Sequence, residues 1–220
     1  MTFSADELPE IAGVLLLTLR VGASGLLVGL AIGIPLGLWL ALARFPGRRL
    51  VLGAANAGMG LPPVLVGLVV ALLLWRSGPL GVLELMYSPA AMIVAQALIA
   101  TPIVISLTAA GIQQLGDQLP DQLRALGASR SQLSWLLLKE ARLPLLAAAM
   151  AAAGRLLSEV GAAMMVGGNI RGETRVLTTA MVLEVRQGQF AMALVMGLVL
   201  LVLALVVNGA LTWLQQRRTS

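Results

Sequence analysis

Long uninterrupted apolar runs constrain this chain more than any other feature of its sequence. They cover about residues 20–43, 50–75, 90–114, 145–167 and 190–214. Roughly 20 apolar residues in a helix cross the hydrocarbon core of a bilayer. The runs do not alternate apolar and polar residues as barrel strands do, so helices are expected. The sequence therefore predicts an all-α integral membrane protein, a single domain over residues 1–220 with about five transmembrane helices.

A shorter apolar stretch, Ile11 to Leu19, precedes the first run. It is too short to cross the bilayer alone. Residues 8–19 therefore form either an interfacial helix or an extension of the first span, and a sixth crossing is not favoured. Three acidic residues and no basic residue come before Arg20, which differs from the positively charged start of a secretory signal peptide.

Composition excludes several functional classes. Only 11% of the residues are charged, against about 25% in a soluble domain. The chain has no cysteine and no histidine, so disulfides, zinc sites of the usual kind and histidine acid–base chemistry are excluded, and no cofactor or metal site is expected. The net charge of +5 would suggest nucleic acid in a soluble protein. In a membrane protein it fits positive charge kept in the cytoplasm, so we expect no nucleic-acid partner.

The distribution of charge predicts the orientation. One side of the predicted membrane carries nine basic and three acidic residues, a net of +6, and the other carries five basic and six acidic residues, a net of −1. The basic side includes Arg44, Arg48, Arg49, Arg124, Arg130, Lys139, Arg142, Arg217 and Arg218. The positive-inside rule then places the N-terminus outside and the C-terminus in the cytoplasm, as expected for an odd number of spans.

Residues 115–143, on the predicted cytoplasmic side, have more structure than a simple connection. A helix can begin near Pro120. One apolar stripe along it is formed by Leu119, Leu123 and Leu126. Gly127 suits the left-handed position that ends a helix. Ser129 and Gln132 then match a capping box for a second helix. Two interpretations stay open from these residues alone: a hairpin on the inner leaflet, or a contact surface for a partner.

This segment resembles the cytoplasmic loop of binding-protein-dependent ABC importer permeases, whose pattern is Glu-Ala-Ala, three residues, glycine, and a later Leu-Pro. Asp121, Gln122 and Leu123 stand at the Glu-Ala-Ala positions, and Leu143–Pro144 comes four residues later than usual. The resemblance implies a coupling helix at about 118–128 that contacts a cytoplasmic ATPase dimer. The residues it implies for ATPase coupling are Leu119, Asp121, Leu123, Arg124, Ala125, Leu126, Gly127 and Ala128.

Other segments resemble the molybdate and tungstate permeases of the same family, with the tungstate-type branch nearest. They are Ile34–Gly37, Gly60–Gly67 and several stretches within 154–180, including Ser158–Gly161 and Met165–Ile170. The resemblance implies a type I importer permease that acts as a homodimer with an extracytoplasmic substrate-binding protein. Sulfate or amino acid import remains an alternative. The segment Asn169–Gln189 is the expected docking loop, with candidates Asn169, Arg171, Glu173 and Arg175.

Four residues within predicted spans are candidates for a gate or translocation path. Arg155 and Glu159 lie four residues apart, so on one helix they could pair with each other or contact an anion. Pro62 and Pro63 remove backbone donors and produce either a plain kink or a break that lines a cavity.

Two rival functions are disfavoured by what the sequence lacks. An enzyme needs a cluster of acid, base or nucleophile side chains, and only Asp117 and Asp121 form a near pair. A channel or secondary transporter often shows internal repeats, and none is evident. The chain also has no Gly-rich phosphate-binding loop ending in Gly-Lys-Ser/Thr, so ATP hydrolysis is expected on a separate subunit.

Overall fold

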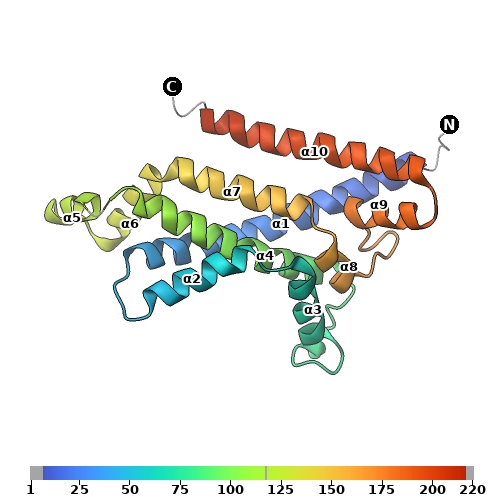
Figure 1. Ribbon diagram of the computed structural model, residues 1–220, viewed down its shortest axis with the longest axis horizontal. Coiled ribbons are helices and arrows are strands. Elements are labelled where there is room, and N and C mark those ends of the chain that lie inside the picture. Colours follow the sequence, from blue (N-terminus) through green and yellow to red (C-terminus); the bar gives the residue numbers. More distant parts are fainter. Residues whose placement is uncertain (1–6, 117, 217–220) are drawn as a thin grey trace.

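The computed structural model describes residues 7–116 and 118–216, and in these ranges the chain is helical without a β-strand. The elements are α1 (Glu7–Leu42), α2 (Arg48–Met59), α3 (Pro63–Leu74), the 3-10 turn η1 (Gly81–Leu83), α4 (Pro89–Gln113), α5 (Gln118–Ala125), α6 (Arg130–Glu140), α7 (Arg142–Leu157), α8 (Gly161–Gly167), α9 (Leu177–Arg186) and α10 (Phe190–Gln216). Figure 1 shows the long helices side by side, with the two ends of the chain at opposite ends of the bundle.

Among the described residues, three helices are long and apolar enough to cross a membrane unaided: α1, α4 and α10. Residues 8–19 are part of α1, so the continuous-helix alternative is correct and there is no separate interfacial helix. The spans predicted at 50–75 and 145–167 are not continuous helices. Each is a bent pair, with 102° between α2 and α3 and 61° between α7 and α8, and counting each pair as one span gives up to five.

The seam between α1 and α4 holds the bundle together. Gly25, Gly29, Gly33 and Gly37 of α1 face α4 so closely that a Cβ on any of them would lie within 2.7 Å of an α4 atom. Small residues that allow backbones to approach are typical of helix interfaces in lipid, where van der Waals packing replaces the hydrophobic effect. These four glycines, each four residues after the last, therefore form a tight helix–helix contact.

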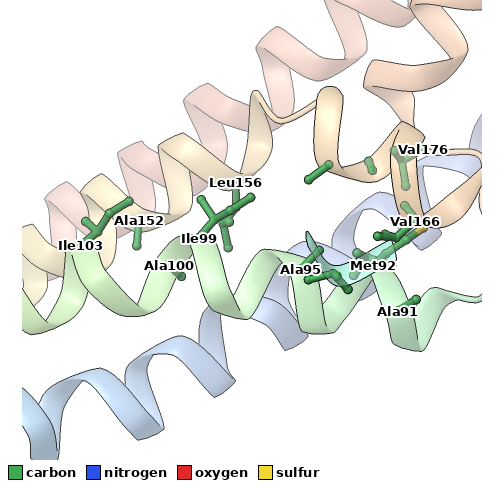
Figure 2. Close-up of a cluster of buried hydrophobic side chains, with 14 of the residues drawn as sticks. Ala91, Met92, Ala95, Ile99, Ala100, Ile103, Ala152, Leu156, Val166 and Val176 are labelled. Carbon is green, nitrogen blue, oxygen red and sulfur yellow. The ribbon is translucent and has the colours of Figure 1, made fainter. Parts of the chain in front are cut away.

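The main core lies where α4 meets α7 and α8. Figure 2 shows Ile99 and Ile103 of α4 packed near Ala152 and Leu156 of α7, with Met92 close to Val166 of α8. In contrast, α10 packs on α7 and α9 but exposes most of its surface. Only 17% of its most apolar 18-residue stretch is buried. A helix so apolar and so exposed faces lipid or another chain rather than water.

The two ends of the bundle differ in polarity. The end that carries α5 and α6 also carries Arg44, Arg48 and Arg130, whereas Glu10 and Glu173 lie at the opposite end near α9. Trp39 stacks on Phe45 at the first end with ring centroids 5.2 Å apart, and Trp75 meets Tyr87 edge-on beyond α3 at 6.2 Å. Asp6, Asp117, Arg217 and Arg218 lie outside the described residues.

Candidate coupling and translocation site

The segment 115–143 has the helix, turn and helix that its sequence predicts. Gly127 adopts φ +82° between α5 and α6, the left-handed conformation that glycine enters without steric cost. The capping box is formed: the amide of Gln132 donates to Ser129 Oγ at 3.3 Å, and the amide of Ser129 donates to Gln132 Oε1 at 2.8 Å. Local signals alone therefore determine this reversal of the chain.

Apolar side chains attach the segment to the bundle. Leu119 and Leu123 pack with Leu133 and Leu137 of α6 onto a cluster that includes Ile112 at the end of α4. The predicted stripe is wrong at Leu126, because α5 ends at Ala125 and the turn directs Leu126 outward, 84% exposed. Pro120 is buried inside the first turn of α5, and the helix already includes Gln118.

The outer surface of α5 is polar and open. Arg124 Nη1 donates to Asp121 Oδ1 at 2.8 Å, and both side chains are more than half exposed. An exposed pair of this kind contributes at most about 1 kcal/mol to stability. Behind α5 lies a cavity of about 520 Å³ lined by Arg44, Arg48 and Gln113 among others. The segment therefore rests on the bundle by its leucines and leaves Arg124, Ala125, Leu126 and Gly127 available to a partner.

The Pro62–Pro63 pair breaks its span instead of kinking it. Pro62 is extended at φ −61° and ψ 122°, and Pro63 is the first residue of α3. A residue that precedes proline is kept out of the helical region by clashes with the ring, so consecutive prolines stop α2. Because α3 leaves at 102° to α2, it points away from the long helices (Figure 1).

Arg155 and Glu159 do not form the helical pair that their spacing allows. The helix ends at Leu157, so the two residues lie on either side of a break. Glu159 is 4% exposed; its Oε1 accepts the amide of Ala162 at 2.8 Å, and its carbonyl oxygen accepts Thr178 Oγ1 at 2.7 Å. The carboxylate therefore supports the start of α8. The half-buried guanidinium of Arg155 makes no ion pair or hydrogen bond within the described part of the chain.

The two broken spans pack against each other. A Cβ on Gly67 of α3 would lie 2.6 Å from Cα of Ala162 of α8, and Val64 is in contact with Gly161. The start of α3 and the start of α8 are therefore neighbours, so the structure brings Pro63 and Glu159 into one region of the fold. Discontinuous helices at membrane depth occur where they are buried in protein or line a water-filled cavity.

The segment expected as a docking loop, Asn169–Gln189, contains a helix. Its α9 buries Leu177, Thr178, Thr179 and Ala180, and the amide of Leu177 donates to Thr18 Oγ1 of α1 at 2.9 Å. The residues of this segment outside the helix are 169–176 and 187–189, and Asn169 has φ +56°. Thr174, fully buried, accepts the amide of Ile170 at 2.9 Å and donates to the carbonyl oxygen of Gly167.

Two of the docking candidates are tied to the first helix. Arg171 pairs with Glu10 Oε2, and Arg175 Nη1 lies 3.3 Å from Glu10 Oε1, while Glu173 is exposed. Sequence reasoning missed Glu10, Thr18 and Thr174. Nothing local marks them, because their partners are either far along the chain or created by the turn itself.

Comparisons with known proteins cover nearly the whole chain. A family model described as "Binding-protein-dependent transport system inner membrane component" matches residues 33–220. A "Probable anion ABC transporter permease protein" of Haloferax volcanii is 37% identical over 92% of this chain and 90% of its own length. The "Tungstate uptake system permease protein TupB" of Peptoclostridium acidaminophilum is 36% identical over 94% and 91%.

One solved structure has the same fold. It is the MetNI methionine ABC transporter in an inward-facing conformation, with a TM-score of 0.75, 21% identity, and coverage of 98% of this chain and 97% of the other. At that identity the likeness concerns the fold alone.

Proposed function

The chain belongs to the family of binding-protein-dependent transport system inner membrane components and is an ABC importer permease, and we propose that its substrate is a tetrahedral oxyanion, with tungstate or molybdate first. The observation that supports this substrate is the identity of 36–37% to anion and tungstate permeases over more than nine-tenths of the chain. Sulfate is the same class of anion and belongs in the same test.

Energy would enter through the coupling segment. Leu126 and its neighbours Arg124 and Ala125 form an exposed tip on a segment that is fixed to α4 and α6 by Leu119 and Leu123. Closure of a cytoplasmic ATPase pair would displace this tip, and the packed leucines would pass the movement to the bundle as a rigid-body change. ATP hydrolysis itself is assigned to the separate subunit.

The path would lie between two copies of the chain. The broken spans of one copy leave Val64, Leu65 and Met165 exposed. A homodimer would cover these apolar surfaces and place the α2–α3 and α7–α8 breaks of both copies around one axis. Arg155 would then bias this path toward anions, and Pro62 and Pro63 would allow its walls to move.

The proposed orientation places the N-terminus outside. It is supported by the basic residues gathered at the end that carries α5 and α6, which would be the cytoplasmic end of a bacterial inner-membrane protein. A binding protein would dock at the opposite end, on the loop of Asn169, Arg171, Glu173 and Arg175. Because Arg171 and Arg175 already pair with Glu10, docking there would also affect α1.

The experiment that tests the substrate is uptake of labelled tungstate, molybdate and sulfate into cells with and without this chain. The expected result is uptake of one oxyanion that depends on the chain and is blocked by the same unlabelled ion. Equal uptake of all three in both strains would exclude the oxyanion proposal. Purification of the tagged chain tests the partners, since recovery without an ATPase subunit would contradict the coupling role.

A further inference from the structure

Helix α2 exposes a polar side chain at membrane depth. None of its twelve residues is buried, although it forms half of a broken span. The inner face rests on α4, where a Cβ on Gly58 would lie 2.8 Å from Pro102. The opposite face consists of small exposed residues and one amide, namely Gly53, Asn56, Ala57 and Gly60.

The depth of Asn56 follows from the position of Arg48. Arg48 donates to the carbonyl oxygens of Leu40 and Ala41 at 2.7 and 2.9 Å, which fixes the start of α2 to the end of α1 at the basic end of the bundle. Asn56 follows eight residues later, or about 12 Å along a helix. The hydrocarbon core is roughly 30 Å thick, so Asn56 lies near its middle, about one turn before α2 ends at Met59.

An amide in hydrocarbon needs a partner, because leaving it without one costs several kcal/mol. Asn208 of α10 satisfies this requirement within its own helix, where its Nδ2 donates to the carbonyl oxygen of Ala204 at 2.9 Å. Asn56 does not: its side chain is exposed and makes no hydrogen bond to any residue that the structure describes. Its partner therefore lies outside the described part of the chain, and lipid cannot supply one.

We propose that Asn56 lines the translocation path and donates a hydrogen bond from its carboxamide to the passing oxyanion. This inference rests on the proposed function. A hydrogen bond to an ion contributes about 1.5–3 kcal/mol, which replaces part of the lost hydration without holding the anion as a free guanidinium would. The small residues beside Asn56 leave room for an anion, and the nearby break lets the backbone move.

The chain contains no cysteine, so Asn56→Cys introduces a single thiol. The assembled transporter in membrane vesicles is treated with a charged, membrane-impermeant thiol reagent. Cys at position 56 is expected to react, and Asn208→Cys, which faces lipid and its own helix, is expected to stay unreacted. Arg49→Cys at the exposed start of α2 confirms that the reagent reaches the protein. An unreactive Asn56→Cys in an assembled complex overturns the proposal.

Uptake provides the second measurement. Asn56→Ala is expected to lower the initial rate of tungstate uptake by about tenfold or more. Asn56→Asp is expected to abolish it, because a carboxylate repels a dianion in a medium of low dielectric. Asn208→Ala serves as the control with unchanged uptake, and recovery of the ATPase subunit reports assembly. Unchanged uptake by Asn56→Ala overturns the proposal.

Failure of this inference and failure of the proposed substrate give different results. If the wild-type chain moves none of the three oxyanions but Asn56→Cys reacts, the substrate is wrong and the position of Asn56 in an aqueous path stands. If the wild-type chain imports tungstate while Asn56→Cys stays unreacted, the substrate stands and Asn56 is packed against another chain, so the inference is wrong.

Discussion

Replacing Gly33 with alanine should separate α1 from α4. A Cβ at this position would lie 2.6 Å from Cβ and 2.7 Å from Cγ1 of Val104, and 3.2 Å from the carbonyl oxygen of Thr101. Ordinary contacts are 3.4–4 Å, so the helices would have to move apart locally by roughly 1 Å. Val104 is fully buried and has no free space to enter. Overpacking of this kind costs about 1–3 kcal/mol.

A control within the same helix isolates that cost. Gly13 also lies in α1, but a Cβ there would meet nothing within 4 Å. Both Gly33→Ala and Gly13→Ala gain the same helix propensity, about 1 kcal/mol, so the difference between the two variants reports the steric term alone. At this chain length 1 kcal/mol corresponds to roughly 2–4 °C in Tm, so Gly33→Ala should melt about 2–12 °C below Gly13→Ala.

Thermal unfolding of the purified variants in detergent measures this difference. Gel filtration then reports how much of each variant stays monodisperse. Equal melting temperatures for the two variants would refute the reasoning, since they would mean that α1 and α4 are not in close contact. A lower Tm for Gly13→Ala would refute it as well.

Three other predictions use single contacts. Gly127→Ala should reduce recovery of the ATPase subunit several-fold in co-purification, because a backbone φ of +82° costs about 1–2 kcal/mol for a residue with a Cβ. Unchanged recovery would contradict the role of this turn. Thr18→Val removes the acceptor for the buried amide of Leu177 and should lower stability by about 1–3 kcal/mol. Thr18→Ser keeps the hydroxyl and should not lower it. Equal melting temperatures of the two variants would contradict the contact. Arg155→Ala should abolish oxyanion uptake while the complex still assembles, and normal uptake by that variant would end its assignment to the path.

Local sequence signals predicted the segment 115–143 best. The turn at Gly127 and the capping box of Ser129 and Gln132 depend only on residues within a few positions of one another, so the sequence contains all the information they need. Leu126 shows the limit of that information. Its spacing matched the stripe, but the helix ended one residue earlier and the side chain turned outward.

Spacing failed where a helix did not continue. Arg155 and Glu159 would share a face on an unbroken helix, yet Glu159 leaves α7 and accepts the amide of Ala162 instead. No local residue pattern announces this break as Pro62 and Pro63 announce theirs. It is held by contacts from elsewhere, such as the hydroxyl of Thr178 on the carbonyl oxygen of Glu159.

The sequence by itself determined that the chain is a membrane protein, because a chain with apolar runs of this length and so few charges is not stable in water. It also determined the basic end of the bundle, the helix pair within residues 115–143 and, through resemblance, the permease family. Only the tertiary structure decided that the span at 145–167 is broken between α7 and α8, that Glu10 holds Arg171 and Arg175, and that Asn56 has no partner within the described chain. The physical reason is distance along the chain: these features depend on groups that folding brings together, and no local pattern encodes them.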